Sequence, residues 1–243
     1  LLLQLNRDDA GGAMDGHVSM ASLRWNGWFG LNSDESLAIS YTAEGIAQFG
    51  TADSAYWGTP GKDDANVKAF AAAVTVDLHV QLGNHALRFG LEWDYASGDS
   101  DPTDNDFQTF RSPFPFGHKY HGFADQIGWR NLHDFSAVVN WTWKGLDWID
   151  ALSVLLQGHA FQRENDDDAW YSPAGTVIRS GSPAASDELG YEADLVVNLN
   201  VNRWVAFQVG WAHFFAGRFV SQTATGVGPG SDNEDSDMDF AWA

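Results

Sequence analysis

Apolar and polar residues alternate along most of the chain. In residues 66–82, Val74 and Val76 lie on one parity, whereas Thr75 and Asp77 lie on the other. A period of two residues over such a length predicts a strand with one apolar and one polar face. The same pattern recurs along the chain and predicts ten strands. They cover residues 1–6, 17–30, 37–49, 66–82, 86–96, 131–143, 148–161, 188–201, 204–215 and 237–243.

The connections between these strands alternate in length. The short ones are residues 31–36, 83–85, 144–147 and 202–203, and the long ones are 7–16, 50–65, 97–130, 162–187 and 216–236. Strands of a soluble β-sandwich average about 5–6 residues. Membrane-spanning strands need about 9–11 residues, with short turns on one side and long loops on the other. Strand length and loop asymmetry therefore favour a membrane barrel, in which apolar faces contact lipid and polar faces line a lumen.

The composition narrows the classes of partner. The chain has 33 Asp and Glu against 13 Lys and Arg, for a formal net charge of -20. This balance argues against nucleic acid, whose phosphates require basic residues. The absence of Cys excludes disulfides and Cys-ligated metals, and the absence of a long apolar run predicts no transmembrane helix. Much of the acidic charge lies in the long connections, which suits an extracellular surface.

Four segments occur in order in the second part of the chain. They read LRFGLEWDYASGD (87–99), FPFGHKYHGFADQIGWRNLHDF (114–135), DAWYSPAG (168–175) and ELGYEADLVVNLNVNRWVAFQVGWAHFFAGRFV (188–220). Together they resemble the alginate export family of Gram-negative outer-membrane porins. The resemblance is close over residues 86–243, and over the earlier residues it is limited to the general style of the sequence pattern.

The resemblance implies an all-β fold, a transmembrane antiparallel up-and-down β-barrel, with 18 strands in the best-known family member. It also implies contact with the lipid bilayer and lipopolysaccharide, and export of anionic uronate polysaccharide or other solutes through a basic lumen. We expect residues 1–243 to form a single outer-membrane barrel domain, incomplete at both ends, without enzymatic activity or a cofactor. The alternatives are a scaffold barrel that encloses or supports an envelope partner protein, and an outer-membrane Asp/His hydrolase.

The polar parity of the predicted strands is acidic, unlike the basic lumen that the family implies. The predicted pore-lining residues are Arg24, Glu44, Asp77, His79, Arg88, Glu92, Asp94, Asp134, His159, Glu192 and Asp194. Asp239 is expected to face the lumen with them. Because such a wall repels polyanions, these residues predict a pore that favours cations or neutral solutes.

The longest connection holds a group of polar and aromatic residues that we expect at the pore. Its polar members are His118, Lys119, Tyr120, His121, Asp125 and Arg130. One interpretation is a constriction loop that presents these side chains to an anionic solute. The other is a plug, in which the aromatic side chains fill the barrel mouth. The aromatic residues are Phe114, Phe116, Tyr120, Phe123 and Trp129.

Acidic residues in three connections are weak calcium candidates. Asp99, Asp101, Asp104 and Asp106 have a spacing similar to that of a calcium loop, but they lack the Gly that an EF-hand turn needs. Residues 164–170 and 231–237 are similarly acidic. A solvated loop is the simpler interpretation of such charge. No G-x-S-x-G or HExxH motif occurs, so no catalytic residues are predicted.

Overall fold

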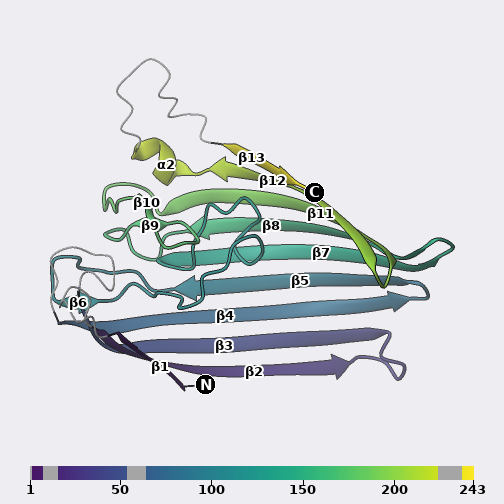
Figure 1. The fold of residues 1–243 in the computed structure, drawn as a ribbon, viewed down its shortest axis with the longest axis horizontal. Coiled ribbons are helices and arrows are strands. Elements are labelled where there is room, and N and C mark those ends of the chain that lie inside the picture. Colours follow the sequence, from purple (N-terminus) through teal and green to yellow (C-terminus); the bar gives the residue numbers. More distant parts are fainter. Residues whose placement is uncertain (1, 8–15, 54–63, 224–236) are drawn as a thin grey trace, which may run out of the picture.

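Ten long strands dominate the structure, a computed structural model that describes residues 2–7, 16–53, 64–223 and 237–243, with only the backbone for residues 2–7. The long strands are β1 (Leu2–Arg7), β2 (Gly16–Gly30), β3 (Leu37–Ala52), β4 (Ala65–Leu82), β5 (His85–Ala96), β7 (Leu132–Leu146), β8 (Ile149–Gln162), β11 (Glu188–Asn202), β12 (Val205–Ala216) and β13 (Met238–Trp242) (Figure 1). All ten agree with the predicted strands to within a few residues. The predicted all-β fold is confirmed.

The long strands form one antiparallel up-and-down sheet. Each strand pairs with the next in the order β1-β2-β3-β4-β5-β7-β8-β11-β12-β13, and β6 (Asp106–Phe107) joins β4 in parallel. In the part of the chain that the structure describes, β1 and β13 each have a single neighbour, so the sheet is open. Closure into a barrel, and the expectation that residues 1–243 are a single incomplete barrel domain, stay predictions.

The short turns lie at one end of the sheet and the long connections at the other, as the alternation in length predicted (Figure 1). The turn between β4 and β5 is tight because Gly83 adopts a positive φ of 58°, which glycine accepts without a steric penalty. Three of the predicted long connections, residues 7–16, 50–65 and 216–236, lie largely outside the described residues. Within the described residues, no helix is long and apolar enough to cross a membrane.

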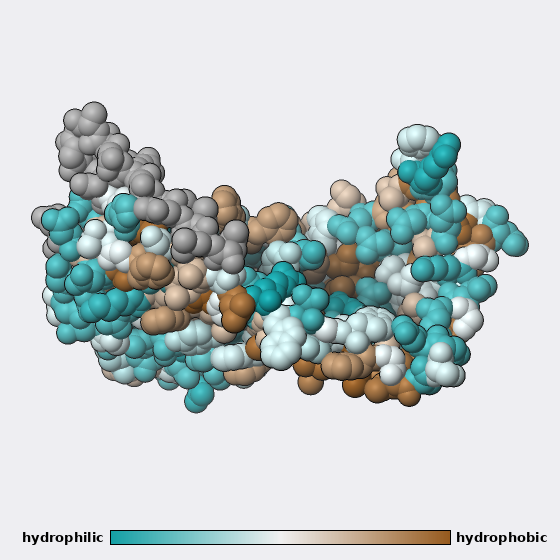
Figure 2. Space-filling view, turned by 90° about the horizontal axis from the view of Figure 1, so that it is seen from below, coloured by the Kyte–Doolittle hydropathy of each residue, from teal (hydrophilic) through white to brown (hydrophobic). Residues whose placement is uncertain are grey.

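One face of the sheet exposes its large apolar side chains. Val76 is 46% exposed and Phe89 is 43% exposed, whereas both would be covered between the layers of a sandwich. Apart from the small β9–β10 ribbon, the described strands belong to one sheet, so the sandwich alternative is wrong. In Figure 2, hydrophobic side chains gather along the lower margin of the right half. We call this surface the apolar face and the opposite one the polar face.

At the end with the long connections, the polar face is covered by a substructure that we call the cap. The cap comprises residues 97–131, residues 163–187 with β9 (Trp170–Tyr171) and β10 (Val177–Arg179), and the helix α2 (Arg218–Gln222). Its buried side chains Phe110, Ile127 and Trp170 belong to one core cluster with Phe161 and Phe214 of the strands. This apolar contact fixes two long connections against the sheet instead of leaving them in solvent.

Candidate functional site

The eleven predicted pore-lining residues share the polar face. Arg24 pairs with Glu44 across β2 and β3, Asp94 with Asp134 across β5 and β7, and His159 with Glu192 across β8 and β11. Because residues directly opposite in antiparallel strands point to the same side, these registers place the charged side chains in adjacent rows. That this face lines an aqueous lumen stays a prediction.

Asp239 is a correction to the sequence analysis. It pairs with His213 of β12, and its carboxylate accepts hydrogen bonds from the ring nitrogens of Trp211 (3.0 Å) and His213 (2.9 Å), which lie on the apolar side. The neighbouring aromatic residues point the other way, since Phe123 of the cap stacks on Trp242 at 5.0 Å between ring centroids. Because Trp242 contacts the cap on the polar face, the odd-numbered residues of β13 point to the apolar face. The Asp239 carboxylate therefore lies on the apolar side.

Toward the short turns, the polar face is nearly neutralised by internal pairs. Arg88 donates to Asp77 at 3.0 Å, and the Ser40 hydroxyl lies 2.8 Å from Nε2 of His79. Nearer the cap, Arg24 lies 3.9 Å from Glu44, which also accepts a 2.6 Å hydrogen bond from a serine hydroxyl. The two arginines thus compensate two of the carboxylates and leave the others to be balanced elsewhere.

Beneath the cap, acidic and imidazole side chains form a buried chain. His121 of the cap lies between two strand carboxylates, with Nδ1 3.2 Å from Asp134 and 3.6 Å from Asp94. Nδ1 of His159 lies 3.0 Å from both oxygens of Asp134, and its Nε2 is 3.7 Å from Asp194. All five residues are buried. Two imidazoles therefore face three carboxylates in a region that excludes water.

The predicted constriction loop divides into an inner and an outer part. His121 is buried, and the backbone N–H of Ala124 donates to Glu192 at 2.8 Å, which ties the loop to β11. In contrast, His118 forms an outer ion pair with Asp125 at 2.9 Å. Lys119 lies over the ring of Tyr120 at 5.1 Å and takes no part in the buried chain.

A cavity of about 390 Å³ lies between the loop and the sheet. Strands β2, β3 and β5 contribute charged side chains to its lining, β4 contributes Ala73 and Thr75, and the cap contributes aromatic and basic side chains. Its charged and polar lining residues include Arg24, Glu44, Glu92, Asp94, Tyr120 and Arg130. The sequence predicted these residues as two separate groups, one on the strands and one in the loop, and the fold brings them to one hollow.

Arg130 is the basic group that the cap brings to this cavity. Its guanidinium lies over the ring of Tyr171 at 5.4 Å and donates to the Gly175 carbonyl at 3.4 Å. Burial lowers the pKa of Arg130 to about 10, because removal from water disfavours its charged form. The hydroxyl of Tyr171 donates to the Asp168 carboxylate at 2.7 Å. Burial and this carboxylate raise the pKa of Tyr171, because both disfavour the negatively charged phenolate.

The aromatic residues of the loop take different positions. Trp129 packs on Phe110 at 5.2 Å within the cap core, and Phe123 stacks on Trp242. Phe114 and Phe116 are exposed, although both border the cavity. The constriction and plug interpretations both stay predictions.

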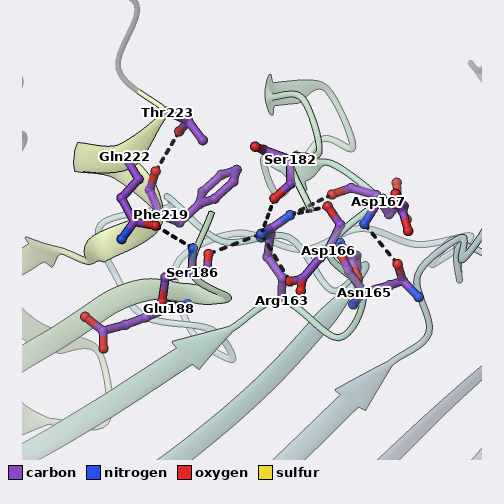
Figure 3. Close-up of polar contacts among 12 residues, drawn as sticks. Arg163, Asn165, Asp166, Asp167, Ser182, Ser186, Glu188, Phe219, Gln222 and Thr223 are labelled. Atoms are coloured by element: carbon purple, nitrogen blue, oxygen red, sulfur yellow. Dashed lines mark hydrogen bonds and ion pairs between the residues drawn. The ribbon is translucent and has the colours of Figure 1, made fainter. Parts of the chain in front are cut away.

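Arg163 holds the cap together and was not identified from the sequence. It follows β8, its side chain is fully buried, and it lies 4.0 Å over the ring of Phe219 in α2. Figure 3 shows its guanidinium reaching Ser182, Ser186 and Asp166, which come from opposite ends of residues 163–187. Burial lowers the pKa of Arg163 despite the acidic residues around it. The only sequence signal was a single Arg before an acidic run.

Most of the weak calcium candidates accept hydrogen bonds from the backbone of their own loop. Asp99, Asp101 and Asp104 each accept a hydrogen bond from the backbone N–H two residues on, the pattern of Asx turns, and Asp106 binds Asn66 and Lys68. Calcium binding there stays a prediction. Of the other acidic runs, residues 164–170 lie in the cap, and residues 231–236 lie outside the described residues.

A single sheet of long antiparallel strands, apolar on one exposed face and charged on the other, is typical of outer-membrane β-barrel proteins. The chain belongs to the alginate export family, a family of outer-membrane porins, because the family model described as "Alginate export" matches residues 2–229. The resemblance found in the sequence is confirmed, and the match begins well before residue 86. No curated protein matches the chain. The family is one of transport proteins, not of enzymes.

Proposed function

We propose that this chain forms the wall of an outer-membrane pore, with its apolar face in lipid and its polar face bordering water. The observation that carries the proposal is the separation of side chains by face: Val76 and Phe89 are exposed on one side, and Asp77 and Arg88 lie on the other. In water, so large an exposed apolar surface would promote association. In a bilayer, hydrocarbon solvates it. Family membership supports the same location.

We further propose that the pore favours cations or neutral solutes over polyanions. At the cavity, the Arg24–Glu44 pair is internally compensated, and the other two carboxylates, of Glu92 and Asp94, share the lining with Arg130 and His121. Fixed charges in a narrow, low-dielectric passage attract ions of opposite sign. Polysaccharide is the solute class that the family supports, and the acidic wall favours a neutral or weakly charged polymer over a polyuronate.

Reconstitution in a planar bilayer tests this function. In a tenfold KCl gradient, we expect stable single-channel conductance and a reversal potential with the sign of cation preference. Glu92→Gln should shift that potential toward zero, because it removes a carboxylate that borders the cavity. Asp239→Asn is the matched control, since it removes an exposed carboxylate from the apolar side and should leave the potential unchanged. A clear anion preference would overturn the proposed selectivity.

Packing of the cap supports a second candidate, a scaffold barrel that is closed at this end and supports a partner at the cell surface. The core cluster joins Phe110 and Trp170 of the cap to Phe214 of the sheet, so the cap is a packed unit. Negligible conductance of correctly inserted protein would favour this candidate over the pore.

A further inference from the structure

Four acidic and two imidazole side chains lie buried together beneath the cap. We call this group the acid–histidine cluster. It consists of Asp94, His121, Asp134, His159, Glu192 and Asp194. Even with both imidazoles protonated, four carboxylates would exceed two positive charges. A buried carboxylate is costly unless a cation or hydrogen-bond donors compensate it.

Several oxygen atoms in the cluster lack a hydrogen-bond partner, although Oδ2 of Asp194 lies 3.7 Å from Nε2 of His159. Oδ1 of Asp94 and both carboxylate oxygens of Asp194 are buried and have no hydrogen-bond partner among the described residues. The Asp94 side chain is only 5% exposed. Buried polar atoms in folded proteins are almost always satisfied, so such atoms indicate a ligand or an ion. This observation is independent of the clustering itself.

Three side chains of the cluster have the geometry of a metal site. Nδ1 of His121 lies 3.6 Å from Oδ2 of Asp94 and 3.2 Å from Oδ2 of Asp134. One ligand atom from each residue lies within 4.8 Å of the others. Ligands at metal–ligand distances of about 2.0–2.2 Å in a tetrahedral site are about 3.3–3.6 Å apart. The two distances from His121 therefore suit ligands of one small ion.

We propose that Asp94, His121 and Asp134 bind a divalent transition-metal ion of the Zn²⁺ type. One imidazole with two carboxylates is a donor set that such ions accept, whereas Ca²⁺ and Mg²⁺ prefer oxygen ligands alone. His159 contacts both oxygens of Asp134 at 3.0 Å, which holds that carboxylate in place as an outer-shell residue does. Asp94 and His121 also line the cavity, so an ion has a route to the site.

The ion would fasten the loop to the wall. Asp94 lies on β5, Asp134 on β7 and His121 on the cap, so the three ligands come from three separate parts of the chain. The backbone contact of Ala124 with Glu192 already orders the loop next to the site. Metal binding therefore stabilises the position of residues 118–125 over the strands, and removal of the metal loosens it.

The test uses the purified protein after EDTA treatment and dialysis, titrated with Zn²⁺ in a calorimeter, with bound metal counted by elemental analysis. We expect one Zn²⁺ per chain, loss of binding in Asp94→Asn and His121→Gln, and an affinity about 10–100-fold lower in His159→Gln. The matched control is His118→Gln, which changes the other imidazole of the loop in its outer pair with Asp125. It should bind Zn²⁺ as the unmodified chain does.

Folding is checked separately by the mobility shift on heating in detergent. If a variant does not fold, protease cleavage within residues 97–131 of the unmodified protein tests the site instead, and we expect Zn²⁺ to slow that cleavage at least several-fold. Absence of stoichiometric Zn²⁺, or equal loss of binding in His118→Gln and His121→Gln, would overturn the site. So would a cleavage rate that Zn²⁺ does not alter. Conductance plays no part in these readouts, so they fail or succeed independently of the pore.

Discussion

Replacement of Arg163 by Met should release the cap from the sheet. The guanidinium makes three contacts of 3.2 Å or shorter, to the carbonyls of Asp166 and Ser186 and to the Asp166 carboxylate, and two longer ones to the carbonyls of Asp168 and Ser182. Hydrogen bonds that involve a charged group contribute at least about 1.5 kcal/mol each. The three short contacts therefore predict a loss of about 4–5 kcal/mol in the free energy of opening the cap, since methionine cannot donate to these oxygens.

Hydrogen exchange followed by mass spectrometry measures this opening directly. A loss of that size corresponds to about a thousandfold faster exchange in peptides from residues 163–187, whereas the strands should keep their protection. Arg218→Met is the matched control: its side chain is 68% exposed, and its ion pair with Glu188 at 3.4 Å should contribute less than about 1 kcal/mol. Equal exchange in Arg163→Met and the unmodified protein, or an equal effect of the control, would refute the role assigned to Arg163.

Two further pairs of substitutions test the faces of the sheet and the fit of the loop. Val76→Arg places a charge on the apolar face and should destabilise the protein in lipid vesicles by about 2–4 kcal/mol. Thr75→Arg places the same charge at the cavity and should destabilise the protein far less. Equal losses of stability in urea titrations of the two variants would contradict the assignment of faces. Gly122→Ala should increase protease cleavage of the loop, because φ is 83° and the added methyl would overlap the Glu192 carboxylate. Gly83→Ala, with φ of 58° and open space around it, should lose only about 1–2 kcal/mol and leave the cleavage unchanged.

The strands were predictable from the sequence because a two-residue period indicates both the strand and its apolar side. Val76 and Asp77 reveal their faces by parity alone, and the short turns fix which strands are neighbours. The same reasoning failed at Asp239, because parity in a five-residue strand was inferred from its charge. The aromatic contact of Trp242 with Phe123, which sets the true orientation, joins residues far apart in the sequence.

The cap was beyond prediction for a physical reason. Its core residues, such as Phe110 and Ile127, have no period, and they pack against strand residues far away in the sequence. The residues of the acid–histidine cluster were each predicted, His121 in the loop and Asp134 on a strand, but their contact at 3.2 Å depends on how the loop folds back. Sequence patterns assign faces to periodic elements, and they carry no such information for an irregular connection.

The distribution of charge on the polar face connects the proposed selectivity to the cap. Near the short turns, Asp77 and Arg88 lie 3.0 Å apart and largely cancel, so this region contributes little to ion preference. Uncompensated carboxylates are concentrated where the cap meets the sheet, at the cavity that Glu92 and Asp94 border. A metal ion shared by Asp94 and Asp134 would remove much of that negative potential and would also hold His121 in place. The same contact that positions the loop would therefore set the charge that a passing solute meets, so the position of the cap and the selectivity of the pore should change together.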